Sequence, residues 1–445
     1  MPEEKRAYPR IKSRLKAIVG NKIPADVYDL SEGGAGLDAG NKLPQKTFSL
    51  KILFPKRHDD FKARGRVAWQ KNGQDKSLCG VEFLSLNRAQ RTALRSEVVK
   101  THISGLSKNI WPAQKRNVRN FFLKDVMDYM GRIESFLPDI RENSDYSFRI
   151  QKEFDHITTQ ILLKGYCLEE LLADAGASDK IKNGFRGLIG SWLYRSEILK
   201  DISGIASGRG DRHRFLDIIY ENKLLSEGLG RYIDNYFLRS PYAVAMRLRK
   251  EKIKELLLGI IKESSAGHLS ILSMGCGKCR EIWELSPELK SDKKLIFTCV
   301  DYDDLLLDAS KKTLVMSAPN NVKFRFVNAA SQDMAANGDT ARYIGEHDVI
   351  YSLGLIDYLE DNTLKHLIQL LYGCLRKNGT MIITHKNKEK TFPPLTPDWL
   401  CGWRSIPRSI DDIAGLLRKA GIPDTSITTK SDDFQYIRYF IITKG

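Results

Sequence analysis

Residues 268–285 of the chain read HLSILSMGCGKCREIWEL, and this stretch decides the fold of the C-terminal part. The apolar run 268–274 predicts a buried β-strand, and residues 279–285 predict the start of a helix. Gly275 and Gly277 lie between them and predict a tight turn, because glycine adopts left-handed backbone conformations without steric cost. Such a turn lets the backbone pass close to a ligand and directs helix N–H groups at it. The stretch therefore predicts a strand, a ligand-binding loop and a helix in succession.

Strand and helix patterns alternate on both sides of this stretch, from residue 240 to residue 445. Further strands are predicted at 294–301, 322–329, 347–354, 379–386, 425–431 and 434–444, and helices at 242–261, 305–315, 362–375 and 410–419. This alternation is typical of an α/β doubly wound sheet, here of seven strands, with helices on both faces. Because no helix separates the last two strands, we expect them to form an antiparallel hairpin at one edge.

The N-terminal part has a different pattern. Up to residue 87, short apolar or alternating runs are separated by Gly, Pro, Asn and Asp, which predicts a small β-barrel. A helical pattern at 88–99 follows the barrel, and the composition of 104–116 is that of a linker.

Between these regions the apolar residues recur with helical spacing. From 119 to 237 they form stripes such as Phe122, Val126, Met130, Ile133 and Leu137, which predict packed helices. The chain is therefore predicted to be multidomain, with a β-barrel domain at 1–113, a helical domain at 114–239 and an α/β domain at 240–445.

The charge distribution favours an anionic partner for the N-terminal part. The 445 residues carry a net charge of +16, of which +14 falls within residues 1–120, where 25 Lys and Arg face 11 Asp and Glu. Such an excess favours nucleic acid, a nucleotide or acidic lipid, although a basic solvated surface has the same pattern. With no apolar run of transmembrane length, a charged start unlike a signal peptide and seven scattered cysteines, we expect a cytoplasmic protein.

Two short motifs lie in this basic region. Arg6-x-x-x-Arg10 is followed, after a predicted strand, by Asp29-x-Ser31-x-x-Gly34. Arginine can form a bidentate fork to a guanine and also stack on it, and an aspartate can accept hydrogen bonds from guanine N–H groups. With both motifs in order, the N-terminal region resembles the PilZ family, the bacterial receptor domains for cyclic di-GMP. The resemblance implies ligand contacts from Lys5, Arg6 and Arg10, on a tail outside the strands, and from Asp29, Ser31 and Gly34. A basic tail followed by an Asx turn is the alternative interpretation.

The glycine loop is compatible with one nucleoside cofactor in particular. A dinucleotide loop would need a third glycine where Arg280 stands, and the P-loop pattern is absent. S-adenosylmethionine has no pyrophosphate and needs fewer glycines. Asp301 ends the next predicted strand, 24 residues after Gly277, where an acid can bind both ribose hydroxyls.

From residue 242 to residue 445 the chain resembles the class I S-adenosylmethionine-dependent methyltransferases. The resemblance implies a cofactor site formed by Ser273, Gly275, Cys276, Gly277, Asp301, Tyr302, Asn328, Ala329 and Ser352. Two positions depart from the family pattern, because Ser273 replaces the usual acid and Cys279 replaces the third glycine. The missing acid weakens the expected contact with the amino group of the methyl donor.

Methyl transfer from a sulfonium requires a base only if the acceptor must lose a proton. Asp357 and Tyr358, after the fourth strand, are the predicted catalytic residues; His385 and Asp398 are alternatives, and a structural role stays open for each. The runs LGLIDYL and PDWLCGWRS also resemble bacterial proteins grouped with the biosynthesis of a hydroxypalmitic acid methyl ester, which implies a hydroxyl or carboxyl acceptor on a lipid-like molecule. No metal site is expected, because the histidines are dispersed and Cys276-x-x-Cys279 has no second such pair.

These observations predict a cyclic di-GMP-responsive protein in which a PilZ-like domain regulates a methyltransferase that acts on a small-molecule or lipid-like acceptor. The helical domain would be a transmitter, a cap or a homodimer interface. One alternative is a catalytically inactive adaptor whose methyltransferase-like domain binds a protein partner. Nucleic acid is the remaining alternative for the basic region, and it is not the expected partner.

Overall fold

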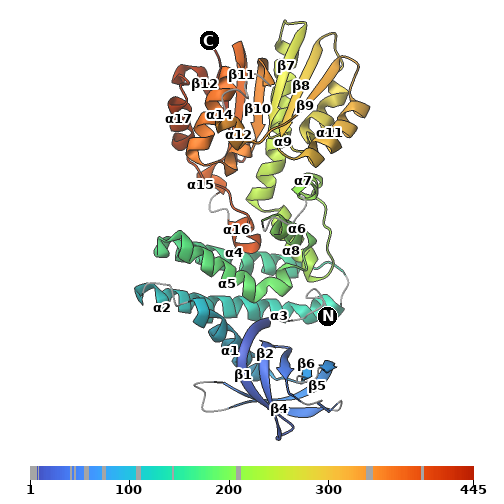
Figure 1. Ribbon diagram of the computed structural model, residues 1–445, viewed down its shortest axis with the longest axis vertical. Coiled ribbons are helices and arrows are strands. Elements are labelled where there is room, and N and C mark those ends of the chain that lie inside the picture. The colour runs from blue at the N-terminus through green and yellow to red at the C-terminus, as the bar shows by residue number, and fades with distance from the viewer. Residues whose placement is uncertain are drawn as a thin grey trace. The chain divides into compact units, whose positions relative to one another are not determined.

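The computed structural model describes residues 8, 10–40, 43–44, 47–54, 60–72, 77–106, 112–142, 145–206, 212–336, 344–391 and 395–445 (Figure 1). The chain divides into two compact units. The first unit comprises Met1–Gly210, Leu224–Phe237 and Leu395–Trp403, and the second comprises Asp211–Lys223, Leu238–Pro394 and Arg404–Gly445. The sequence limits 1–113, 114–239 and 240–445 stay predictions. They do not anticipate that a short segment of the C-terminal region belongs to the first unit.

The first unit begins with a closed β-barrel, as predicted. Its strands are β1 (Arg10–Val19), β2 (Ile23–Ser31), β3 (Gly34–Asp38), β4 (Phe48–Leu53), β5 (Phe61–Asn72) and β6 (Ser77–Leu84), in the order β1-β2-β3-β6-β5-β4. Burial alternates along β1 and β4, because every second side chain faces the barrel interior. The sequence pattern did not predict the strand β3, because its glycine-rich start is typical of a turn.

Helices make up the rest of the first unit. They are α1 (Arg88–Leu106), α2 (Pro112–Asn120), the π-helical turn η3 (Phe121–Val126), α3 (Met127–Glu142), α4 (Phe148–Leu172), α5 (Ala175–Leu193), α6 (Glu197–Ala206), α8 (Leu229–Leu238, whose last residue falls in the second unit) and α16 (Leu395–Cys401). The predicted stripe from Phe122 to Leu137 is buried throughout, which confirms it as core. The linker expected at 104–116 was wrong in part, because α1 extends to Leu106 and α2 begins at Pro112.

The second unit is built on a seven-stranded sheet, as predicted. The strands are β7 (His268–Met274), β8 (Lys294–Asp301), β9 (Val322–Asn328), β10 (His347–Leu353), β11 (Leu375–Lys386), β12 (Ile427–Ser431) and β13 (Ile437–Thr443), in the order β12-β13-β11-β10-β7-β8-β9. The first five are mutually parallel, and β12 and β13 form the predicted antiparallel edge hairpin. The strand order reverses between β7 and β10, and ligands bind outside the carboxyl ends of strands at such a point.

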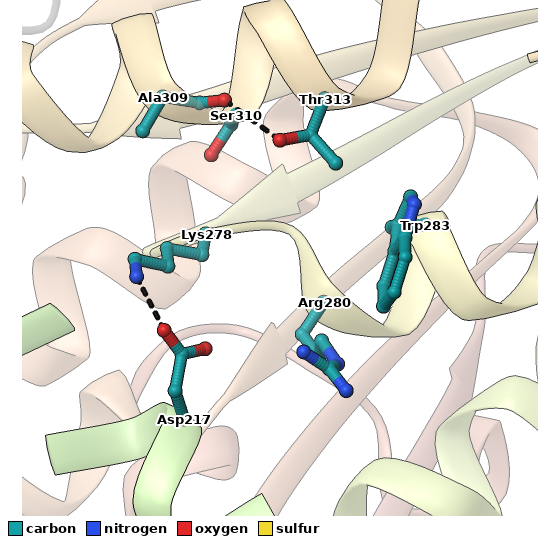
Figure 2. Close-up of a pocket in the computed structure, with 7 residues that line it drawn as sticks. All are labelled: Asp217, Lys278, Arg280, Trp283, Ala309, Ser310 and Thr313. Atoms are coloured by element: carbon teal, nitrogen blue, oxygen red, sulfur yellow. Dashed lines mark hydrogen bonds and ion pairs between the residues drawn. The ribbon is translucent and has the colours of Figure 1, made fainter. Parts of the chain in front are cut away.

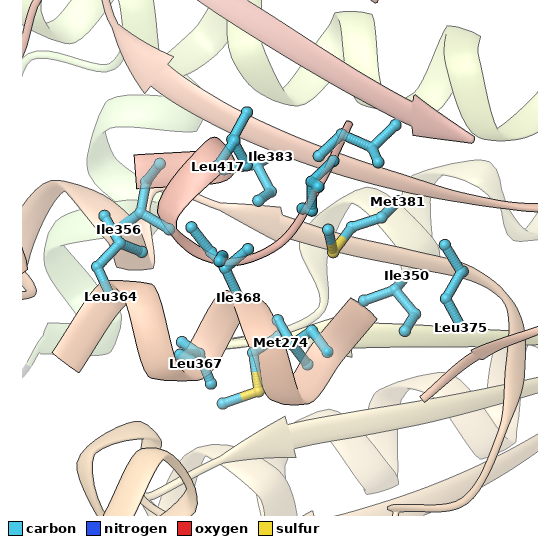
Figure 3. Close-up of a cluster of buried hydrophobic side chains, with 14 of the residues drawn as sticks. Met274, Ile350, Ile356, Leu364, Leu367, Ile368, Leu375, Met381, Ile383 and Leu417 are labelled. Atoms are coloured by element: carbon cyan, nitrogen blue, oxygen red, sulfur yellow. The ribbon is translucent and has the colours of Figure 1, made fainter. Parts of the chain in front are cut away.

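Helices cover both faces of this sheet. The helices of the second unit are α7 (Arg212–Glu221), α9 (Pro241–Glu263), α10 (Arg280–Leu285), α11 (Asp304–Ser317), α12 (Ser331–Ala336), α14 (Asp361–Gly373), α15 (Lys388–Thr391) and α17 (Ile410–Lys419), with short 3₁₀ turns η4 (Ser286–Glu288), η6 (Leu355–Tyr358) and η7 (Asp424–Ser426). On one face, Leu364 and Ile368 of α14 and Leu417 of α17 pack on sheet residues such as Met381 (Figure 3). On the other face, the core includes residues of α9, α10 and α11. Within the described residues, no helix is long and apolar enough to cross a membrane.

Candidate functional sites

The two motifs of the barrel lie side by side on neighbouring strands. Arg10 is the first residue of β1 and pairs in register with Ser31 on β2. Its Nη1 donates to Oδ1 of Asp29 at 2.5 Å, and both side chains are about one-fifth exposed, at 21% and 22%. The expectation that Arg10 lies on a tail outside the strands was therefore wrong. Lys5 and Arg6 lie outside the described residues.

The turn that carries Ser31 and Gly34 is closely packed. The Ser31 hydroxyl donates to the carbonyl oxygen of Gly34 at 3.1 Å. A Cβ at position 34 would lie 2.2 Å from the Val81 carbonyl oxygen, and one at Gly33 would lie 2.5 Å from the Tyr8 ring. Glycine is thus required at both positions because neighbouring atoms take the space of a side chain.

A charged network joins both motifs to the helices, and sequence reasoning missed it. Glu32, within the second motif, is buried and accepts a bidentate pair from Arg95 of α1, with Nε–Oε1 at 2.5 Å and Nη2–Oε2 at 2.6 Å. Arg95 also donates to Glu134 of α3. Arg91 Nη1 donates to the same carboxylate at 2.8 Å and to the hydroxyl of Tyr8, which lies inside the first motif.

The positive and negative charges of this network are equal in number, and one of its carboxylates is ionised only in part at neutral pH. Burial raises the pKa of Glu32 to about 7, although Arg95 acts in the opposite direction. Two carboxylates, Glu32 and Glu134, thus face two guanidinium groups, Arg91 and Arg95. The signal that could have revealed the network is the spacing of the arginines four residues apart, which places them on one face of α1.

The glycine loop of the second unit follows β7 as predicted. Gly275 and Gly277 have φ values of +67° and +53°, which favour glycine. The Gly275 N–H donates to the Val300 carbonyl at 2.9 Å, and the Gly277 N–H donates to Oδ2 of Asp301 at 2.9 Å. A Cβ at position 275 would lie 3.0 Å from Leu355, in the loop after β10. The loop is therefore held at the point where the strand order reverses.

The residues predicted to bind ribose and adenine gather at the ends of β8 and β9. The Ala329 N–H donates to the Asp301 carbonyl at 3.0 Å, and Asn328 Nδ2 donates to the Tyr302 carbonyl at 3.3 Å and to Asp304. The Tyr302 side chain is 49% exposed, so its ring is accessible to a flat ligand. The structure thus brings Gly277, Asp301, Tyr302, Asn328 and Ala329 together at one edge.

Asp301 is buried, and so are the predicted cofactor residues Ser273, Cys276 and Ser352. Cys276 belongs to the core beneath the loop, and Ser273 lies in the middle of the sheet. Ser352 is also buried, and its Oγ has no hydrogen-bond partner among the described residues. Close by, the Tyr351 hydroxyl donates to Oε1 of Glu281 at 2.7 Å. Burial raises the pKa of Glu281 to about 8, so this acid is protonated at neutral pH; the sequence analysis did not single it out.

Asp357 lies at the centre of a buried charge cluster. Its Oδ2 is 2.6 Å from Nζ of Lys386 and 3.1 Å from Nη1 of Arg249, and its Oδ1 is 2.6 Å from Nδ1 of His385. Burial alone would raise the pKa of Asp357, but Lys386, His385 and Arg249 hold it well below its usual value. This environment disfavours the predicted role as a base, and Asp357 is better described as the counter-ion of its neighbours.

Tyr358 lies at the edge of this cluster. Its side chain is 41% exposed, and its hydroxyl is 3.1 Å from the hydroxyl of Tyr242. The Lys386 ammonium lies 4.9 Å from the Tyr242 ring centre and 5.5 Å from that of Tyr358. Asp398, an alternative base, is part of α16 in the first unit and pairs there with Lys182.

A separate recess of about 190 Å³ lies between α7, α10 and α11 (Figure 2). Its charged groups are already paired, because Lys278 donates to Asp217 and Arg280 pairs with Glu284 at 2.7 Å. The Arg280 guanidinium also lies 4.6 Å from the ring centre of Trp283. None of the lining residues belongs to the predicted cofactor site. Among the described residues, no group of three or more His, Cys, Asp or Glu is arranged to hold a metal ion.

Comparisons with known proteins found a family match and similar proteins. Residues 4–100 match the PilZ domain family, so the N-terminal barrel is a PilZ domain. The tRNA N(3)-methylcytidine methyltransferase trm140 of Schizosaccharomyces pombe is 30% identical over 156 residues, which are 34% of this chain and 48% of that protein. The chain thus spans about half the length of this curated relative.

Two solved structures show distant similarity. A possible exported protein from Bordetella parapertussis has a TM-score of 0.41 and 14% identity, over 72% of this chain and 96% of its own. The magnesium protoporphyrin IX methyltransferase of Synechocystis PCC 6803 with bound SAH has a TM-score of 0.34 and 16% identity, over 46% of this chain and 87% of its own.

Proposed function

We propose that the protein is a methyltransferase that uses S-adenosylmethionine and responds to cyclic di-GMP. The observation that carries the proposal is the hydrogen bond from Gly277 to Asp301 at the strand-order reversal of a doubly wound sheet. The PilZ match at the other end of the chain supports the regulatory part. The acceptor would be a small or lipid-like molecule with a hydroxyl or carboxyl group, and a protein that uses these two ligands would act in the cytoplasm.

The described residues fit the cofactor. The left-handed glycines let the loop backbone approach a ligand, Asp301 lies at the carboxyl end of β8, and Tyr302 offers an exposed ring. When bound, S-adenosylmethionine supplies a methyl group already activated as a sulfonium. The chain then has to align donor and acceptor, and alignment supplies much of the rate in such a reaction. Tyr358, which is partly exposed, would orient an acceptor at the edge of the site.

The barrel supports cyclic di-GMP binding through residues that are already assembled. Arg10 and Asp29 are partly exposed and lie together, and Gly33 and Gly34 keep the adjacent turn compact. Lys5 and Arg6 would complete the contacts. Tyr8 and Glu32 come from the two motifs and are both linked to Glu134 through an arginine, so a ligand that moves either motif would act on α3. The helices would transmit this change as a coupling free energy between two ligands.

Calorimetric titration of the full chain with S-adenosylhomocysteine and with cyclic di-GMP tests the proposal. We expect Gly277→Val to abolish binding of the first ligand only, because a β-branched residue is strained at positive φ. We expect Arg10→Ala to weaken binding of the second ligand only, and the exposed Lys16→Ala to change neither.

Failure of the unaltered chain to bind S-adenosylhomocysteine would favour the inactive adaptor, in which the methyltransferase-like domain binds a protein partner. If both ligands bind, each should change the affinity of the other by the same factor, since linkage is reciprocal. Equal affinities with and without the other ligand would overturn the regulatory part.

A further inference from the structure

Two buried cations, one within α9 and one at the end of β11, share a single carboxylate. The side chains of Arg249 and Lys386 belong to residues that are 4% and 6% exposed, and both contact Oδ2 of Asp357. Among the described residues, Asp357 provides the one hydrogen-bond acceptor of the Arg249 guanidinium, which carries five N–H donors. Within the part of the chain that the structure describes, the Lys386 ammonium also faces the rings of Tyr242 and Tyr358.

Among the residues that the structure describes, the groups beside this cluster do not supply a second negative charge. Nε2 of His385 accepts the Arg408 N–H at 3.1 Å, which places the ring N–H on Nδ1, facing Asp357, so His385 adds no negative charge. The phenols of Tyr242 and Tyr220 stay protonated, since burial raises the pKa of Tyr242 well above its usual value and that of Tyr220 to about 12. The cluster therefore carries one positive charge in excess.

Other buried cations of the second unit are compensated. Lys250 contacts both carboxylate oxygens of Glu284 at 2.6 Å. Arg408 contacts Asp361 and donates to the carbonyls of Ile356, at 2.8 Å, and Leu359. An unpaired buried charge is costly, so the excess at Arg249 and Lys386 indicates that an anion completes the cluster.

The cluster lies where an acceptor would have to lie. A Cβ on Gly354, in the loop after β10, would be 2.2 Å from Nη1 of Arg249, so the guanidinium packs directly on this loop. The loop begins next to Ser352, whose buried hydroxyl has no partner among the described residues. Gly275 of the glycine loop contacts the same segment at Leu355. The Arg249 guanidinium and the Ser352 hydroxyl thus lie at the strand ends, beside the proposed site of the methyl donor.

We propose that Arg249 and Lys386 form a binding site for an oxyanion of the methyl acceptor, a carboxylate or a phosphate, with Asp357 as their positioning counter-ion. The assignment of the anion to the acceptor rests on the proposed function. The planar guanidinium suits a two-oxygen anion, and the ammonium adds a point charge. Tyr242 and Tyr358 hydroxyls lie beside the cations and would select the orientation of the bound group.

Calorimetry with three probes of equal chain length tests this site on the full chain. Octanoate and octyl phosphate carry the two candidate anions, and octanamide is the neutral analogue; each is titrated with and without S-adenosylhomocysteine. We expect one anion to bind at least about 10-fold more tightly than octanamide, as for a charge-assisted pair. Lys386→Gln and Arg249→Lys should remove most of this preference, whereas the exposed Lys390→Gln should keep it.

The titrations separate the two proposals. If the unaltered chain prefers an anion but does not bind S-adenosylhomocysteine, the site stands and the methyltransferase proposal fails. Equal affinity for all three probes, or an anion preference that survives both substitutions, would overturn the site. The site is also overturned if Lys386→Gln weakens the binding of S-adenosylhomocysteine but not that of 5′-methylthioadenosine. The cations would then bind the amino-acid carboxylate of the methyl donor. Retention of affinity for 5′-methylthioadenosine shows that a variant is folded.

Discussion

The Arg10–Asp29 pair of the barrel and the Arg249–Lys386–Asp357 cluster of the sheet both place cations around one carboxylate, but water reaches only the first. In the barrel the charges are equal in number and partly exposed, and they form part of a short sequence motif. In the sheet the cations exceed the carboxylate and all three side chains are buried. The comparison shows that a solvated ion pair costs little without a further partner, whereas a buried excess charge is costly unless an anion compensates it, which is the basis of the proposed anion site.

The largest expected effect comes from removing the shared carboxylate. Asp357→Asn leaves Arg249 and Lys386 buried without a counter-ion, and we expect the free energy of unfolding to fall by about 3–5 kcal/mol, as when one partner of a buried pair is lost. Chemical denaturation of the full chain at neutral pH measures it. Asp361→Asn is the matched control, because Asp361 is largely exposed and its partner Arg408 keeps two carbonyl acceptors. Similar stabilities for both variants would contradict the central role of Asp357.

A smaller change in the free energy of unfolding, of opposite sign, is expected when Glu281, the buried acid beside the glycine loop, is replaced by glutamine. The pKa of Glu281 is raised to about 8 by burial, against a usual value of 4.5. Between these pH values the folded protein holds a proton that the unfolded chain has lost, so stability present below pH 4.5 is lost as the pH rises to 8. Glu281→Gln should therefore stabilise the protein at pH 8 by on the order of 2 kcal/mol and have little effect near pH 4.5.

Thermal unfolding of the unaltered chain and of Glu281→Gln across this pH range provides the measurement. The exposed Glu288→Gln should follow the unaltered chain at every pH. A constant difference between Glu281→Gln and the unaltered chain would show that Glu281 does not titrate in this window.

The smallest effect is expected in the barrel network. Glu32→Gln removes one carboxylate from Arg95, but Glu134 still pairs with that arginine, and the raised pKa of Glu32 means that its ionised form is only weakly favoured. We expect a loss of about 1 kcal/mol in chemical denaturation, within the range of a single hydrogen-bonded pair. Glu82→Gln, in an exposed pair with Arg66, should cost less. A loss for Glu32→Gln as large as that for Asp357→Asn would remove the contrast between compensated and uncompensated clusters.

Much of the fold could be predicted because local patterns report it. The alternating burial of β1 and the apolar stripe from Phe122 to Leu137 follow from periods of two and 3.6 residues. The antiparallel edge hairpin followed from the missing helix between the last two strands. The strand β3 was missed because Gly34 and Gly36 have low strand propensity. Glycine is required at both positions because neighbouring atoms leave no space for a side chain. The assignment of α16 to the first unit was missed because nothing local marks residues 395–403 as separate from their neighbours.

The candidate sites divide in the same way. Arg10, Asp29, Ser31 and the glycines of both loops could be recognised because backbone geometry and short spacing specify them, and the strand order then places Asp301 beside Gly277. The partners that set the charge of each site could not be recognised, because they are distant along the chain. Arg95 pairs with both Glu32 and Glu134. Asp357 contacts Arg249, Lys386 and His385. Sequence alone determined where the loops and motifs occur, since these depend on steric rules that act within a few residues. Tertiary structure alone decided which charges are buried and which are left in excess, because burial and electrostatic pairing depend on distance in space and not on separation along the chain.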